Sequence, residues 1–334
     1  MVSDRRRDFK LDLWGIVLLV PLLISPFVTK DVLISSLTYQ ISIGVAATMG
    51  IYVMLRMGLL SFSVPSFMTI GGYAAAISAT AGWTDIFFLT AISFVAPALV
   101  AAPLGAIVLR LKGIYFIFIT FIFNEILQIL LFETPDLTGG ANGIPGVPPA
   151  TLFGHELAAQ PQLVAVTAAL AIVAALITFV VTHRFRAEFT SIEENETLAE
   201  SLGVALWKYR TIGFIASAGV SGLAGFALVN MLSTAHPSLF ASWSVKSYIA
   251  YAFVGGRGTL LGVAVGSALL IAVTNYFSAF ANLSAGLFGV LLIVVMMLAP
   301  SGIVGSFVKL ADYIRSRSVT RSAPSIKEKQ NEFG

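Results

Sequence analysis

Residues able to do chemistry are few in this sequence and stand far apart. The three histidines, His155, His183 and His236, fall in separate segments, so they form neither a metal-ligand cluster nor a catalytic triad. The patterns GxSxG, HExxH and GxxxxGK[ST] do not occur, and without the last of these the chain has no P-loop for ATP. Cysteine is absent. We therefore expect no catalytic residue, no metal site and no cofactor in this chain, and any ATP must be bound by a partner.

The composition places the chain in a membrane. Hydrophobic residues make up 57% and charged residues 11%, whereas soluble domains carry about 25% charged residues. The net charge of +3 gives no reason to expect a nucleic-acid partner, so membrane lipid is the expected surrounding.

The apolar runs predict an all-α integral membrane protein, a polytopic helical bundle of about ten transmembrane segments with broken or re-entrant helices. A span needs about 20 apolar residues, and the eighth run is short enough to be a tilted or broken helix. The predicted segments are 13–29, 32–55, 58–81, 86–109, 114–132, 162–183, 211–232, 244–256, 259–280 and 283–299.

Loop charges predict that both termini lie inside. Of the 20 Lys and Arg residues, all but Lys30 and Lys246 then fall on the cytoplasmic side. Pro21 and Pro26 interrupt the first run and no cleavage site follows it, which favours an uncleaved helix over a signal peptide. The expected parts are a cytoplasmic segment 1–12, a permease domain 13–305 with an outer loop 133–161 and an inner loop 184–210, and a cytoplasmic tail 306–334.

Two predicted helices carry unusual residues. Glu125 lies near the middle of the fifth segment, where a carboxylate costs about 2.5–3.5 kcal/mol, so it should face a translocation path or bond to another helix. Pro65 interrupts the third segment, which is either a broken helix along a path or a merely kinked packing helix. The residues expected to line or gate a path are Ser61, Phe62, Ser63, Pro65, Gly71, Gly72, Tyr73 and Glu125.

Small residues at four-residue spacing allow close helix packing in lipid. Gly258, Gly262 and Gly266 form a tandem GxxxG pattern at the start of the ninth segment. They predict packing within the subunit or at a subunit interface.

The two longer loops suggest contacts with other proteins. The outer loop contains TGGANGIPGVPP, whose turns suit either a docking surface or a solvated loop. The sequence of the inner loop predicts one amphipathic helix over 193–206. We expect its apolar stripe to dock into a groove on a partner protein. That stripe comprises Ile192, Leu198, Leu202, Ala205 and Leu206.

Several motifs in order resemble the LivM-type permease family of bacterial branched-chain amino-acid ABC importers. The resembling segments are GLLSFSVPSFMTIGGYAAA, KGIYFIFITFIFNEI, LTGGANGI, ENETLAESLGV, FVGGRGTLLGVAVGS and APSGIVG. The resemblance implies an ATPase-coupling role for Glu193, Glu196, Ala199, Glu200, Leu202 and Gly203. It implies docking of a binding protein at Thr138, Gly139, Gly140, Asn142 and Gly143.

The resemblance also implies the partners and the mechanism. The expected assembly holds a paralogous permease or a second copy, two cytosolic ABC ATPases carrying ATP and Mg²⁺, and a periplasmic solute-binding protein, in the bacterial inner membrane. The expected function is alternating-access import of branched-chain amino acids, without enzymatic activity in this chain. A urea or short-amide ABC permease and a stand-alone secondary transporter are the alternatives.

Overall fold

The computed structural model describes residues 2–29, 31–242, 244–278, 284–299 and 302–308. Helices make up nearly all of it, as predicted, and the strands are two residues long. The elements are α1 Val2–Val17, α2 Val20–Val28, α3 Val32–Leu55, α4 Val64–Thr80, α5 Ile86–Val108, α6 Ile114–Glu133, α7 Pro135–Thr138, η1 Gly140–Asn142, β1 Ile144–Pro145, β2 Thr151–Leu152, β3 His155–Glu156, α8 Gln160–Arg184, α9 Arg186–Glu194, α10 Glu196–Ser201, α11 Leu206–Leu232, β4 Thr234–Ala235, η2 Pro237–Phe240, α12 Ser244–Gly255, α13 Leu260–Phe277 and α14 Ser284–Leu298.

In the part of the chain that the structure describes, eight candidate spans are long and apolar enough to cross a membrane. Nine of the ten predicted segments each overlap one helix, and the first, 13–29, overlaps both α1 and α2. Helix α4 has 17 residues and α12 has 12, and neither is among the eight candidate spans. The candidate spans are Phe9–Val28, Val32–Leu55, Ile86–Val108, Ile114–Glu133, Gln160–Arg184, Leu206–Leu232, Leu260–Phe277 and Phe288–Val308, of which the last includes residues outside the described part.

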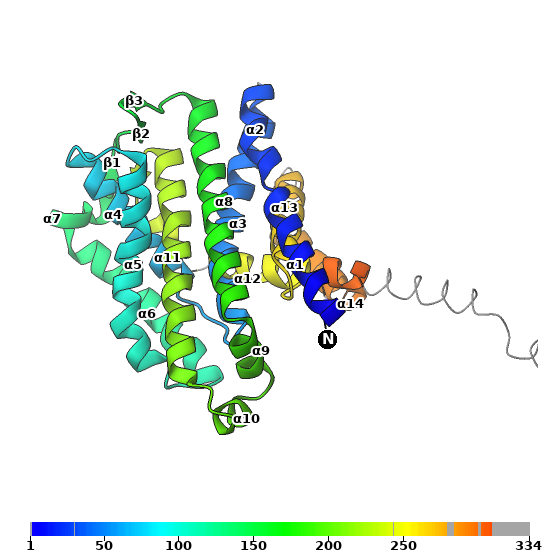
Figure 1. Cartoon of the computed structure of the whole chain (residues 1–334). Helices are drawn as coiled ribbons and strands as arrows, with labels where there is room; N and C mark the ends of the chain where they lie inside the picture. The colour runs from blue at the N-terminus through cyan, green and yellow to red at the C-terminus, as the bar shows by residue number, and fades with distance from the viewer. Residues whose placement is uncertain (1, 30, 243, 279–283, 300–301, 309–334) are drawn as a thin grey trace, which may run out of the picture.

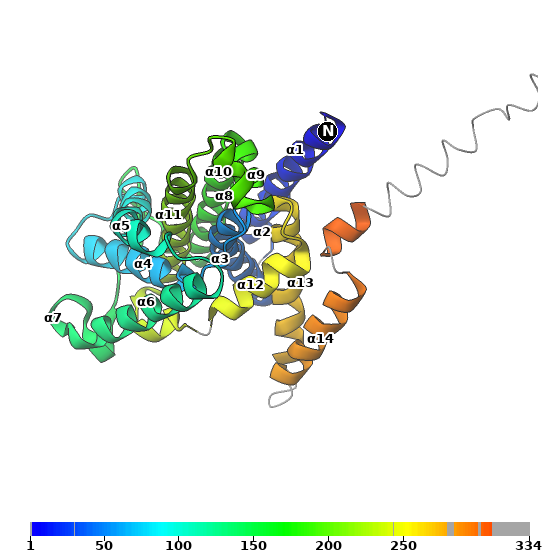
Figure 2. The same cartoon turned by 90° about the horizontal axis from the view of Figure 1, so that it is seen from below.

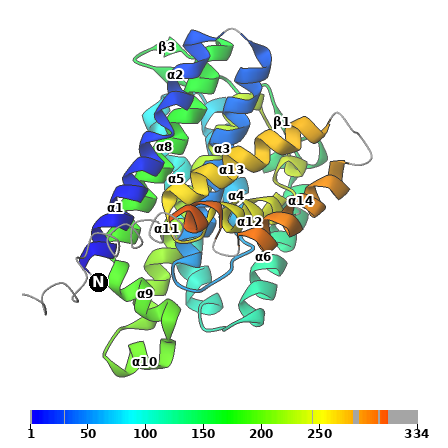
Figure 3. The same ribbon diagram turned by 90° about the vertical axis from the view of Figure 1, so that its right-hand side faces the viewer.

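The first span is built from two helices. The chain turns at Leu18 and Leu19 before α2 begins with Pro21 in its first turn. A proline lacks the N–H of a regular helix and its ring crowds the preceding turn, which accounts for the break. Figure 3 shows α1 and α2 running along the side of α8.

The centre of the bundle is α11, which packs against α3, α4, α5 and α8 (Figure 1). In the most apolar 18-residue stretch of α11, 83% of the residues are buried. Small residues make this packing possible because backbones then approach closely without hydrophobic drive from lipid. A side chain on Gly71 of α4 would meet the backbone of Gly222, and one on Gly225 would meet the carbonyl of Met68.

A second group of helices, α12, α13 and α14, lies on another side of the bundle (Figures 2 and 3). Gly262 and Gly266 of α13 contact the backbone of Gly255 at the end of α12. Gly258 faces open space, so it does not share this contact. The close packing therefore joins α13 to α12 within one chain.

The margin opposite α14 is formed by α6 and α7 (Figure 2). Only Phe116, Thr120, Asn124 and Leu131 of α6 are buried, which is a single stripe at helical spacing. The rest of the helix presents exposed Phe, Ile and Leu side chains, a surface suited to contact with lipid or another membrane subunit.

Candidate functional site

The inner loop forms two short helices where one amphipathic helix was predicted. Asn195 ends α9 in an extended conformation and begins α10, where its side chain accepts a hydrogen bond from the amide of Leu198 at 3.0 Å. Asparagine is favoured at such N-cap positions because its side chain satisfies a free helical N–H. Gly203, with φ of +87°, follows α10 in a conformation that favours glycine.

The break redirects the predicted apolar stripe. Ile192 and Ala199 are buried against the protein, whereas Leu198 and Leu202 point outward with exposed fractions of 57% and 75%. Trp207, at the start of α11, is 72% exposed as well. An outward apolar surface of this kind at the end of a helical bundle is typical of a contact with a partner protein.

A cleft of about 750 Å³ lies beside this surface. Its walls come from the end of α5 with Arg110, from Lys112, and from the segment between Glu200 and Thr211. Gly203 and Trp207 both line it. Leu198 and Leu202 are not part of its lining, and the cleft adjoins their surface through Gly203 and Trp207.

Glu196 is held by two cations from different parts of the chain. Its carboxylate lies 2.9 Å from Nζ of Lys112, in the α5–α6 connection, and also pairs with the guanidinium of Arg210 on α11. Partial burial by itself would raise the pKa of Glu196, but the bonds and charges of Lys112 and Arg210 together lower it below its ordinary value. Neither cation was among the predicted site residues, because their approach to Glu196 depends on helix packing.

Glu193 lies near the end of α9, at a second junction. Its carboxylate is 4.0 Å from the guanidinium of Arg257, in the α12–α13 connection. Gly58, in the turn after α3, approaches the backbone of Glu193. The inner loop therefore contacts connections on both sides of the bundle.

The start of α4 is irregular and polar. The predicted third segment begins at residue 58, yet the helix starts only at Val64, with Pro65 in its first turn. Ser61 and Ser63 share a hydrogen bond of 2.7 Å, and the amide of Phe62 donates to Oγ1 of Thr120 on α6 at 3.1 Å. These bonds replace those that a regular helix would have supplied across the segment.

Farther along α4, Gly71 and Gly72 face α11. A side chain on Gly72 would meet the ring of Phe240 and the carbonyl of Gly225. Tyr73 is buried beside Phe240, with ring centroids 6.3 Å apart, and its hydroxyl has no hydrogen-bond partner among the described residues. This part of α4 is thus close-packed rather than open.

On α6, the neighbours of Glu125 make the contacts expected of Glu125. Asn124 is fully buried and accepts a hydrogen bond from Ser66 on α4 at 2.7 Å, while Gln128 donates to the carbonyl of Phe240 at 2.9 Å. Glu125 is half-buried and forms no hydrogen bond or ion pair within the described ranges. The polar seam between α4 and α6 therefore depends on Asn124.

The outer loop is compact. Thr138 is buried and donates to the carbonyl of Leu131 at 2.6 Å, while β1 pairs with β4. His236 bonds through Nε2 to the carbonyl of Ala141 at 2.9 Å. Gly139, Gly140 and Gly143 all have positive φ, and of the five predicted docking residues only Asn142 is exposed. Figure 1 shows β2 and β3 at the end of the bundle opposite α10.

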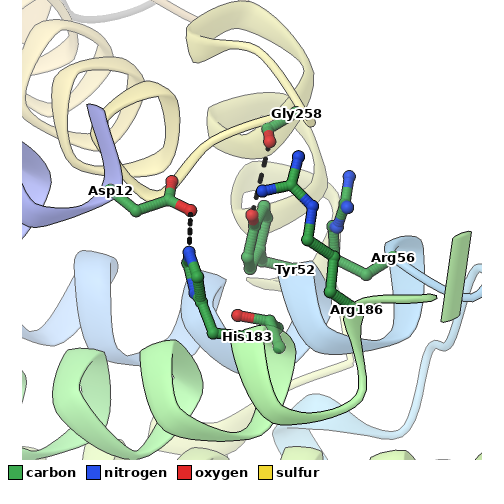
Figure 4. A pocket seen from close by; sticks show the side chains of 7 residues that line it. Asp12, Tyr52, Arg56, His183, Arg186 and Gly258 are labelled. Atoms are coloured by element: carbon green, nitrogen blue, oxygen red, sulfur yellow. Dashed lines mark hydrogen bonds and ion pairs between the residues drawn. The ribbon is translucent and has the colours of Figure 1, made fainter. Parts of the chain in front are cut away.

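The sequence reasoning missed a polar cluster around Asp12, which joins α1 to α8 and α13. Figure 4 shows Asp12 beside His183. Asp12 lies 3.5 Å from Nε2 of His183 and accepts a hydrogen bond of 2.7 Å from the amide of Leu260. The adjoining cavity, which Arg56 and Arg186 also line, measures about 10 Å³, the room of roughly one water molecule. A cavity of this size has no room for a solute.

Comparison with known proteins identifies relatives along most of the chain. Residues 33–300 match the family described as branched-chain amino acid transport system / permease component. The high-affinity branched-chain amino acid transport system permease protein LivM of Salmonella typhimurium is 26% identical over 301 residues, covering 78% of this chain and 69% of the relative. LivM of Escherichia coli is 26% identical over 272 residues, covering 74% of this chain and 64% of the relative. No solved structure matches significantly.

Proposed function

Because this chain belongs to the family of permease components of branched-chain amino acid ABC transport systems, it is a transporter subunit rather than an enzyme, and we propose that it forms an alternating-access path for branched-chain amino acids. The path opens to one side of the membrane and then to the other as separate ATPase subunits bind and hydrolyse ATP with Mg²⁺. The chain lacks a P-loop, so its own contribution is mechanical.

The observation that carries this proposal is the apolar surface formed by α10 and the start of α11. Glu196 fixes α10 there, while Leu198, Leu202 and Trp207 project outward beside the cleft. We assign this surface to the ATPase. Glu193, Ala199, Glu200 and Gly203 belong to the same coupling segment, with Ala199 packed inward and Glu200 exposed.

The orientation follows from this assignment. The α10 end, residues 184–210, lies in the cytoplasm, and loop 133–161 lies outside, where the solute-binding protein docks against the rim at Asn142. Both termini are cytoplasmic in this orientation. The short helices α4 and α12 are broken or partial crossings that complete the ten predicted segments.

The path follows α4. Its polar start at Ser61, Phe62, Ser63 and Pro65 meets α6 beside Asn124. Gly71, Gly72 and Tyr73 are close-packed against α11 and Phe240, so they gate the path rather than line an open space. Glu125 lies at the edge of this seam. Broken helices of this type line the sites of other transporters because their freed polar groups need a cavity or a protein partner.

The assembly contains a second permease subunit, either a paralogue or another copy, together with two ATPases and a periplasmic solute-binding protein in the bacterial inner membrane. The exposed apolar face of α6 faces lipid or that second subunit.

Reconstitution tests the function. Proteoliposomes holding the permease, its ATPases and the binding protein should take up labelled leucine only when ATP is supplied, and isoleucine and valine should compete while urea should not. Vesicles without ATPase are the control. Concentration of leucine by the permease alone, or competition by urea, would contradict the proposal.

A matched pair of variants tests the coupling surface. Leu202→Arg places a charge on the exposed apolar surface and should abolish capture of the ATPase by the purified permease. Glu194→Gln removes a charge from the exposed end of α9, outside this surface, and should leave capture unchanged. If both variants captured the ATPase equally well, the ATPase would not bind at this surface.

A further inference from the structure

We propose that Arg210 is a positioning residue which, with Lys112, clamps Glu196 so that α10 and α11 move as one body and pass the ATPase stroke to the start of α4. The inference rests on the proposed function for the origin of that stroke. The clamp itself is defined by contacts within this chain.

Arg210 is suited to hold α10 because it is buried. Its exposed fraction is 3%, and among the described residues Asp12 and Arg210 are the only charged residues classed as buried. A buried guanidinium separated from its counter-ion would be strongly destabilised, since water cannot replace the lost pairing. Glu196 supplies that counter-ion, so displacement of α10 must either carry α11 with it or leave the charge of Arg210 unpaired.

Lys112 extends the clamp to another element. Its ammonium lies 2.9 Å from the second carboxylate oxygen of Glu196, and its own side chain is largely exposed. An exposed pair adds little stability and is screened by salt. The contribution of Lys112 is to fix the position of the Glu196 carboxylate, which is held between the α5–α6 connection on one side and α11 on the other.

The rest of α11 provides the rigid connection to α4. Gly222 meets the backbone of Gly71, and Gly225 meets the carbonyl of Met68, so no flexible side chain separates the two helices at these points. Such close-packed contacts transmit displacement with little compliance. The same α4 begins at Val64 after the irregular segment containing Ser61 and Ser63, where a shift of the helix can be absorbed.

The clamp is tested first in the purified full-length permease, without transport. Glu196→Gln retains the shape of the side chain and removes its charge, so hydrogen exchange of the amides in 197–204 should accelerate by about tenfold. Arg210→Lys keeps a cation and should give a smaller acceleration. Glu194→Gln, on the adjoining exposed end of α9, is the matched control and should exchange as the unaltered protein does. Unchanged exchange in Glu196→Gln would overturn the clamp.

The second test uses the reconstituted transporter and separates coupling from folding. Glu196→Gln should retain ATPase capture but consume several times more ATP per solute imported, and Arg210→Lys, which keeps a cation beside Glu196, should increase that consumption less. Uptake and hydrolysis falling in equal proportion would indicate a merely structural role and overturn the inference. If the unaltered complex imports no branched-chain amino acid, the proposed function fails, whereas the exchange measurement still decides the clamp.

Discussion

Ser66 on α4 donates a 2.7 Å hydrogen bond to the side-chain oxygen of Asn124 on α6, and both residues are fully buried. This bond joins the short helix α4 to α6, most of whose side chains are not buried. It lies one residue from Glu125, the acidic residue that the apolar sequence makes conspicuous.

A double-mutant cycle should detect this bond. Ser66→Ala and Asn124→Ala, made singly and together, are expected to show a coupling free energy of about 0.6–1.7 kcal/mol, the range for interhelical hydrogen bonds in membranes. Reversible unfolding in mixed micelles measures it. Asn124→Ala combined with Ser201→Ala, on the distant α10, should be additive, and additivity in the first pair as well would disprove the bond's contribution.

Two glycines should respond differently to the same substitution. Gly225→Ala forces a methyl group against the carbonyl of Met68 and is expected to destabilise the protein by about 1–3 kcal/mol. Gly258→Ala adds a methyl group in open space and should change stability by less than about 0.5 kcal/mol. The midpoint of thermal unfolding distinguishes them, and similar losses would contradict the packing of α4 on α11.

Acid should loosen α10 through Glu196. The folded-state pKa of this carboxyl is lowered, so its stabilising contribution is complete above its ordinary value of 4.5 and is lost as the pH falls through the folded pKa. Amide exchange of 197–204, corrected for the intrinsic pH dependence, should therefore accelerate in that acidic range. This acid-induced acceleration should be absent in Glu196→Gln and present in Glu194→Gln. If both variants showed it, a titrating group other than Glu196 would be responsible.

The orientation can be tested by labelling, because the natural chain contains no cysteine. Asn142→Cys and Leu202→Cys each place one thiol at an exposed position. A membrane-impermeant maleimide applied to intact spheroplasts should modify the first and reach the second only after lysis. Modification of both in intact spheroplasts would contradict the proposed topology.

Sequence alone was sufficient for the class of the protein and for most helix positions. Long apolar runs have few stable forms in lipid besides helices, because every backbone polar group needs an internal partner. This constraint explains why α3, α5, α6 and α8 lie close to their predicted ranges. The resemblance likewise identified Glu196 and Gly203 within the candidate coupling segment, while their roles remain predictions.

Tertiary structure decided which polar and small residues act together. Arg210 becomes buried only because α11 begins at Leu206 and lies at the centre of the bundle, and Lys112 reaches Glu196 from a connection distant in sequence. The spacing of Gly258, Gly262 and Gly266 could not distinguish the exposed glycine from the packed ones. Sequence specifies which side chains are available, whereas burial and pairing depend on the packing of helices from distant parts of the chain.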